Sequence, residues 1–273
     1  MDHKNAFASL PPRAQLAAAY RLCDLWGFNE GVCNHLTLEV DGAEDGGEHG
    51  DRGMLVVPHG LLWCETRASD LVRVGVAKGE THAVRAGGRR AYTDVEPSAA
   101  AIHGACHRLL GDRARAILHT HMPYATALAA LQDGAAGRNR VCRLPMVHQN
   151  AALFYGMVAY DDEYNAVASS DEEGERLAKL LLEGGKRVLV LANHGVIVIG
   201  ESVGVACDEL YYFERACQVA LLALSASARP LRPMSNDAAR RVAADRDAER
   251  EKYALAHMTA LVRVRLRGTN FDE

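Results

Sequence analysis

Two short apolar runs stand almost back to back late in the chain, and they constrain its fold more than any other feature. VLVLAN and VIVIG lie on either side of His194 and Gly195. Short apolar runs of this kind predict buried strands. A glycine at their junction would allow the backbone to turn sharply beside the imidazole of His194.

Strand-like and helix-like segments alternate along the rest of the chain. HLTLEV (residues 35–40) and MLVVP (54–58) predict a strand pair, and ARAILHTHM predicts a further strand. Apolar residues at helical spacing, with Pro at the start or Gly at the end, predict the helices. These helices are expected after Pro12, from Pro97 to Gly111, after Pro123, over 172–185 and over 203–225. Such alternation predicts an α/β sandwich.

The composition suits a domain with a large core, followed by a different kind of segment. The chain has 273 residues, of which 49% are hydrophobic, which is ample for one large domain. After about residue 228 no apolar stripe is wide enough to build a separate core. We therefore expect a metal-binding domain over residues 1–228 and a helical extension over 229–273, which packs on the domain surface or on a neighbouring subunit.

Charge and cysteine usage exclude several classes of protein. The net charge is -4 and the pI about 6.3, so the chain has no positive field for nucleic acid. The first residues lack the pattern of a secretory signal, and no run approaches the ~18 apolar residues that cross a bilayer. Seven dispersed cysteines without a CxxC pair indicate reduced thiols in the cytoplasm.

Three histidines form the candidate centre. Side chains alternate faces along a strand, so His119 and His121 of HTH project from one face and can chelate one ion. Taken alone, such a pair more often fills half-buried positions through hydrogen bonds. A third ligand, His194, could be delivered from the junction of the two apolar runs.

Several motifs resemble, in order over roughly residues 12–226, the class II aldolase and adducin-like family, which includes fuculose-phosphate aldolase and ribulose-phosphate epimerase. They are GVCNHLT, MLVVPHGLLW, PSAAAIH, AILHTHMPYATALAAL, LANHGVIVIG and the YYFERACQVALLA helix. The resemblance implies a three-layer α/β/α sandwich with a mainly antiparallel central sheet. It also implies a homotetramer with active sites at subunit contacts, and a metal ion on His119, His121 and His194. Three imidazoles suit Mn, Zn, Fe or Co and leave positions open for substrate.

The chain departs from the sugar-phosphate aldolases of that family at two places. Where those enzymes carry an acidic residue one helical turn before the equivalent of His103, this chain has Ala99, which cannot transfer protons. The positions that hold the substrate phosphate become His35, His59, Gly60, Pro97 and Ser98. Amide and hydroxyl donors are thus largely replaced, so a phosphorylated sugar is not expected.

Both departures are similar to the decarboxylases of the same fold, such as hydroxymethylpyridine-dicarboxylate and dihydroxyphthalate decarboxylases. The resemblance implies a metal-dependent decarboxylase of a non-phosphorylated aromatic hydroxy-acid. We expect His35, His59 and His148 to be the candidate proton donors, and Gly60, Ser98 and His103 to line the substrate site. His35 and His59 could instead bind a second carboxylate.

Other residues and functions stay open at this stage. His103 could replace the missing acid as a fourth ligand or orient another ligand, whereas His107 is expected in solvent. Tyr155, Tyr160 or Tyr164 could reach a neighbouring subunit's site, although half-buried packing is commoner. The alternatives to a decarboxylase are an aldolase that cleaves a hydroxy-keto acid, a nonheme iron oxygenase and a non-catalytic adducin-like module.

Overall fold

The computed structural model describes residues 6–45, 49–50, 52–77, 95–133, 140–163, 170–226 and 229–273. Seven strands in the described residues form one sheet in the order β3-β2-β1-β4-β7-β6-β5. All neighbours pair antiparallel except β5 and β6, which run parallel. The strands are β1 His35–Val40, β2 Gly53–Val56, β3 Val72–Gly75, β4 Ala116–Thr120, β5 Val158–Asp161, β6 Val188–Leu191 and β7 Gly195–Gly200.

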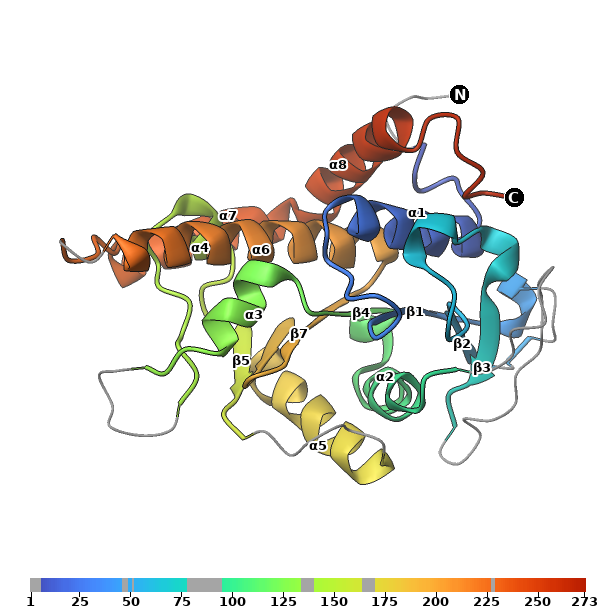
Figure 1. Ribbon diagram of the computed structural model, residues 1–273, viewed down its shortest axis with the longest axis horizontal. Coiled ribbons are helices and arrows are strands. Elements are labelled where there is room, and N and C mark those ends of the chain that lie inside the picture. The colour runs from blue at the N-terminus through green and yellow to red at the C-terminus, as the bar shows by residue number, and fades with distance from the viewer. Residues whose placement is uncertain are drawn as a thin grey trace.

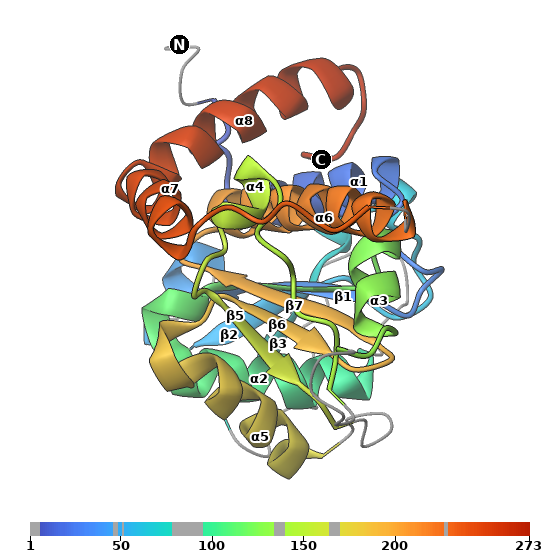
Figure 2. The same ribbon diagram turned by 90° about the vertical axis from the view of Figure 1, so that its left-hand side faces the viewer.

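Helices cover both faces of this sheet, as Figures 1 and 2 show. One face packs on α2 and α5, and the other on α1, α3 and α6. The expected α/β/α sandwich with a mainly antiparallel sheet is therefore confirmed. The helices are α1 Pro12–Leu25, α2 Pro97–Leu110, α3 Pro123–Ala129, α4 Gln149–Ala152, α5 Asp171–Leu182, α6 Val203–Ser225, α7 Asn236–Ala248 and α8 Arg250–Arg265.

Strand alternation divides the core between these two faces. Ile117 of β4 and Ile199 of β7 pack with the side chains of α2 and α5. Leu118 and Val198 point the other way, into the larger core with α1 and α6. Because side chains two apart in a strand share a face, His119 lies on the same side of the sheet as Ile117. The site histidine of β4 therefore faces the α2 layer.

The segment after residue 228 forms two helices where the sequence analysis expects one. Helix α8 packs on the outer face of α6, and α7 packs against α4 (Figures 1 and 2). Met258, Leu266 and Phe271 enter the same core as α1 and α6. The extension thus lies on the domain surface of its own chain.

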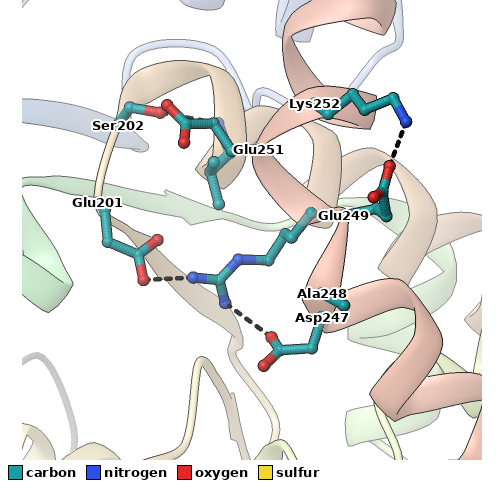
Figure 3. Close-up of a pocket in the computed structure, with 9 residues that line it drawn as sticks. Glu201, Ser202, Asp247, Ala248, Glu249, Glu251 and Lys252 are labelled. Carbon is teal, nitrogen blue, oxygen red and sulfur yellow. Dashed lines mark hydrogen bonds and ion pairs between the residues drawn. The ribbon is translucent and has the colours of Figure 1, made fainter.

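Charged side chains fasten this outer layer to α6. Asp208, which is buried on α6, pairs with Arg246 of α7 and accepts a hydrogen bond from His257 Nδ1 of α8 at 2.8 Å. Beside the α7–α8 junction, Arg250 joins Glu201 and Asp247 across a pocket of about 530 Å³ (Figure 3). Most groups that line this pocket already form ion pairs, and those of Arg250 join the start of α8 to α7 and to the loop before α6.

Strands β3 and β5 were missing from the sequence-based expectation. Both have four residues and lie at the two edges of the sheet. Their sequences, VRVG and VAYD, contain too few apolar residues to stand out. Within the described residues, no helix combines the length and hydropathy required to cross a membrane.

Candidate metal centre

Neighbouring strands bring the three candidate ligands together. His119 lies in β4, His121 is one residue beyond its end, and His194 lies in the turn between β6 and β7. Since β4 pairs with β7 so that Thr120 lies opposite Val196, this turn falls beside the end of β4. One nitrogen from each imidazole lies within 4.8 Å of the other two. Among the described residues, this is the one group of three or more His, Cys, Asp or Glu side chains that converges in this way.

The backbone of the β6–β7 turn differs from the sequence-based expectation in one detail. The left-handed conformation belongs to Asn193, at φ 54°, and not to Gly195. Gly195 is required for another reason, because a Cβ there would lie 2.5 Å from the carbonyl oxygen of Thr120 and 2.8 Å from Cδ2 of His121. Glycine therefore allows the turn to lie directly against the end of β4 and against His121.

Two of the imidazoles are oriented by hydrogen bonds on their far nitrogens. His119 Nδ1 donates to the carbonyl oxygen of Val196 at 3.0 Å, and His121 Nδ1 donates to Glu30 Oε2 at 2.5 Å. Because both acceptors lack hydrogens, each ring keeps its lone pair on Nε2. His121 Nε2 is buried without a hydrogen-bond partner in the described structure. An orphaned nitrogen beside two further imidazoles fits a metal ion.

The electrostatic environment keeps two of these candidate ligands, His119 and His194, neutral at ordinary pH. Burial, reinforced by the neighbouring His121, lowers the pKa of His194 to about 4. Burial also holds the pKa of His119 well below its usual range, with His35, His194 and His121 adding to the effect. A neutral imidazole can coordinate a metal, whereas an imidazolium cannot. The centre is therefore ready to bind a cation at neutral pH.

One predicted catalytic residue, His35, and two predicted substrate-site residues lie together next to this centre. His35 lies opposite His119 in the β1–β4 pairing, with ring centroids 4.9 Å apart. His35 Nδ1 is 2.9 Å from His103 Nε2, and His35 Nε2 is 3.2 Å from Ser98 Oγ. Ala99 is fully buried on α2. The structure thus groups His35, Ser98 and His103, with an alanine at the position that the sugar-phosphate aldolase resemblance assigns to an acid.

A carboxylate lies nearby that the sequence analysis did not single out. Glu96, just before α2, accepts a hydrogen bond from Ser98 Oγ at 3.1 Å. Its other oxygen lies 3.7 Å from Nδ1 of His59, a side chain that is 47% exposed. Gly60 follows His59 with φ at 89°. His59 is therefore linked to the His35 group through Glu96 and Ser98, and Gly60 is its neighbour in sequence.

The remaining predicted side chains are not joined to these groups by any contact described in the structure. His148 precedes α4, and its buried Nδ1 has no hydrogen-bond partner among the described residues. The hydroxyl of Tyr160 accepts from the backbone N–H of Leu144, and Arg240 lies near the ring of Tyr155. Tyr164 lies outside the described residues. Tyr160 thus has a packing role within its own chain.

Glu30 and Thr37 were not predicted from the sequence, and His107 was wrongly predicted to lie in solvent. His107 is fully buried, and both of its ring nitrogens have partners there. Its Nδ1 donates to the carbonyl oxygen of Ala114, and its Nε2 contacts the hydroxyl of Thr37. The i, i+4 spacing of His103 and His107 was the available signal, since both face β1 from α2. No local pattern marks Glu30, which lies in a loop 91 positions before His121.

An antiparallel sheet with helices on both faces and a converging histidine triad defines an α/β protein with a candidate catalytic metal centre. The family model "Class II Aldolase and Adducin N-terminal domain" matches residues 14–221. The chain therefore belongs to the class II aldolase and adducin family.

The individual relatives include both adducins and aldolases. Alpha-adducin of Rattus norvegicus is 32% identical over 223 residues, which are 80% of this chain but only 26% of that protein. A solved aldolase II superfamily protein from Pseudomonas syringae is 29% identical, with a TM-score of 0.80 over 96% of this chain and 95% of that one. L-fuculose 1-phosphate aldolase from Glaciozyma antarctica is 25% identical, with a TM-score of 0.75 over 96% and 92%.

Proposed function

We propose that the chain is a metal-dependent carbon–carbon lyase. The observation that carries the proposal is the convergence of His119, His121 and His194, two of which have their far nitrogens already engaged. Three imidazoles suit Mn, Zn, Fe or Co. A divalent ion bound there would supply a Lewis acid that stabilises negative charge on a substrate oxygen. Glu30 and the Val196 carbonyl orient the rings that would hold it.

The narrower proposal is decarboxylation of a non-phosphorylated aromatic hydroxy-carboxylate. Ala99 supports it, because loss of CO2 requires no base to remove a hydroxyl proton. The bond between the ring carbon and the carboxyl carbon breaks, its electron pair stays on the ring carbon, and a proton then forms the new C–H bond. His35, His59 and His148 are the candidate donors. Gly60, Ser98 and His103 line the substrate site.

Glu96 favours a second candidate, the retro-aldol cleavage of a hydroxy-keto acid. That reaction requires a group to remove a hydroxyl proton, and the Glu96 carboxylate is linked through Ser98 to His35. The likeness to an L-fuculose 1-phosphate aldolase supports the same reaction class. Glu96 would then take the role of the acidic residue that the sugar-phosphate aldolases carry at the position of Ala99.

A non-catalytic role is the third candidate, and the likeness to alpha-adducin favours it. A binding module would not need three aligned ligand nitrogens. Metal analysis by mass spectrometry of protein purified without chelator tests this point. We expect about one ion per chain, lost in His194→Ala and retained in His49→Ala, whose imidazole is 90% exposed beside Asp41. If neither the wild-type protein nor His49→Ala takes up metal, the lyase proposal is removed and the non-catalytic module is favoured.

Product analysis separates the two lyase reactions. Incubation of metal-loaded protein with hydroxylated aromatic acids should release CO2, whereas a hydroxy-keto acid substrate would release an aldehyde. Oxygen consumption with Fe(II) would instead indicate an oxygenase.

Light scattering tests the proposed homotetramer. Activity unchanged in His35→Ala, His59→Ala and His148→Ala would exclude all three as proton donors.

A further inference from the structure

A continuous chain of hydrogen bonds runs from the backbone of residue 114 to the edge of the metal centre. The Ala114 carbonyl oxygen lies 2.7 Å from His107 Nδ1, and His107 Nε2 lies 2.9 Å from Thr37 Oγ1. Thr37 Oγ1 lies 2.7 Å from His103 Nδ1, and His103 Nε2 lies 2.9 Å from His35 Nδ1. All four side chains are at most 3% exposed. Water therefore cannot substitute for a missing partner.

The first link sets the direction of every hydrogen bond that follows. A carbonyl oxygen only accepts, so His107 must carry its hydrogen on Nδ1. A neutral His107 then has a lone pair on Nε2, which requires the hydroxyl of Thr37 to donate. That hydroxyl oxygen accepts from His103 Nδ1, which leaves the lone pair of His103 on Nε2. His35 must in turn donate to it from Nδ1.

These hydrogen-bond directions require neutral imidazole rings, and the surroundings of His107 and His103 favour the neutral form. Burial lowers the pKa of His107 to about 3, against a smaller opposing effect of the Ala114 carbonyl. Burial holds the pKa of His103 well below its usual range, and His35 and His107 add to the effect. Glu39 is the nearest carboxylate to His107, at 3.9 Å from Nδ1. That distance is beyond hydrogen-bond range.

At the Ser98 end of this series of hydrogen bonds, one hydrogen is missing. Ser98 has a single hydroxyl hydrogen but faces two acceptors, His35 Nε2 at 3.2 Å and Glu96 Oε1 at 3.1 Å. These are the longest links of the chain, whereas the buried links measure 2.7 to 2.9 Å. Reversing all the bonds would satisfy Ser98 but would set the lone pair of His107 Nδ1 against the Ala114 oxygen. A mismatch costs least at the part-buried end.

We propose that the Ala114 carbonyl, His107, Thr37 and His103 fix the tautomer of His35, with its hydrogen on Nδ1 and its lone pair on Nε2 facing Ser98. Thr37, His103 and His107 are then positioning residues. The tautomer follows from the hydrogen-bond geometry of neutral rings, and only its consequence rests on the proposed lyase function. In this form His35 presents a lone pair on its Ser98 side, so it accepts a hydrogen bond from a substrate hydroxyl, binds no carboxylate and donates no proton. Of the candidate proton donors, His59 and His148 then remain. The half-exposed His59 is left to face a second carboxylate.

The experiment is a long-range proton–nitrogen NMR correlation on protein with ¹⁵N-labelled histidine, as purified and after zinc is added. The two ring nitrogens of each neutral imidazole have distinct shifts that identify the tautomer, and His35→Asn assigns the His35 signals. We expect His35, His103 and His107 to carry the hydrogen on Nδ1, with the other form disfavoured by roughly tenfold or more. Any of the three with its hydrogen on Nε2 overturns the proposal.

Substitution at Thr37 tests whether this series of hydrogen bonds causes the preference of His35 for one tautomer. Thr37→Val keeps the shape of the side chain but removes the hydroxyl, so the His35 signals should change to a mixture of both tautomers. Thr37→Ser keeps the hydroxyl and should restore the single tautomer. An unchanged His35 in Thr37→Val overturns the proposal, and if that variant does not fold, the wild-type tautomers decide. Since no substrate is present, a protein without lyase activity but with these tautomers would contradict only the proposed function.

Discussion

Glu30 illustrates how an exposed side chain can orient a candidate metal ligand. Its carboxylate is 69% exposed but accepts the Nδ1 hydrogen of His121, whose Nε2 is the orphaned nitrogen of the centre. An outer carboxylate of this kind fixes the orientation of the ring and raises its basicity as a ligand. Glu30 thereby couples a surface loop to the chemistry of the centre.

Replacing Glu30 by Gln should weaken metal binding without unfolding the protein. The amide keeps the size of the side chain but loses its charge, so we expect affinity to fall by about 10- to 100-fold. Competition with a coloured chelator measures this change. Glu183→Gln, which alters an exposed carboxylate after α5, serves as the control and should leave affinity unchanged. Equal affinities of the two variants would contradict the role of Glu30.

The sequence predicts the histidines of the site but misses the residues that orient them, such as Glu30 and Thr37. His119 and His121 follow from strand alternation, and the grouping of His35, Ser98 and His103 accompanies the resemblance. Glu30 could not be predicted, because its partner is distant in sequence and its loop has no periodic pattern. The burial of His107 depends on the Thr37 hydroxyl and the Ala114 carbonyl, and only the folded chain places them beside it.

At the scale of elements, the close approach of the β6–β7 turn to β4 decides whether the ligands meet. Gly195→Ala would place a methyl group 2.5 Å from the carbonyl oxygen of Thr120, which a rigid backbone cannot accommodate. We expect a loss of about 1–3 kcal/mol in unfolding free energy and a marked loss of bound metal. Urea unfolding and metal analysis measure the two effects.

Gly204→Ala is the matched control for that experiment. A Cβ there would make only ordinary contacts with Phe7, at 3.4 Å and beyond, inside helix α6. Because Ala favours a helix over Gly by roughly 1 kcal/mol, this variant should be as stable as the wild type or more so, with its metal retained. A Gly195→Ala protein that matches it in both measurements would show that the close approach is unimportant.

Helix α3 begins two residues after His121 and is held at its start by α6. The buried Glu214 accepts hydrogen bonds from the backbone N–H groups of Tyr124 and Ala125, both at 2.8 Å. Such contacts satisfy donors that every helix start leaves unpaired. Glu214 therefore anchors the backbone next to a candidate ligand.

Removing this anchor should destabilise the protein. Glu214→Ala leaves two buried N–H groups without acceptors, and we expect a loss of about 1–3 kcal/mol. Glu214→Gln retains one acceptor oxygen and should lose less. Thermal unfolding of both variants without metal provides the comparison, and an alanine variant that is as stable as the glutamine variant would contradict the assignment.

Most of these elements could be predicted from the sequence, because apolar periodicity and Pro or Gly boundaries mark them. Strands β3 and β5 could not, since an edge strand of four residues carries little periodic signal. The division of the last segment into α7 and α8 was also missed. That segment is stabilised by charged contacts such as Asp208 with Arg246 and His257, which no apolar stripe reveals.

For the molecule as a whole, its buried histidines make stability depend on pH. The folded chain holds the pKa of His35 and of His107 at about 3, whereas an unfolded histidine titrates near 6.5. Between these values the unfolded state binds more protons, so unfolding free energy falls as pH decreases. Below about pH 6.5, each such histidine contributes a loss that approaches 1.4 kcal/mol per pH unit.

Glu209 opposes this trend and supplies a test of it. Burial raises its pKa to about 7, so between about pH 4.5 and 7 it binds a proton only in the folded state and adds stability as pH falls. Urea unfolding at pH 7.5, 6.5 and 5.5, without metal, should show decreasing stability. Glu209→Gln should steepen the decrease by up to about 1.4 kcal/mol per pH unit. An equal or shallower slope would contradict these assignments.

The position of α7 and α8 has a consequence for how the protein can change over time. Helix α8 rests on the outer face of α6 and α7 rests on α4, whereas the imidazoles of the candidate centre face α2 on the opposite side of the sheet. Substitutions in the outer helices would alter how tightly α6 is covered without displacing a ligand. The stability of the protein and the geometry of its candidate metal centre can thus change independently of each other during evolution.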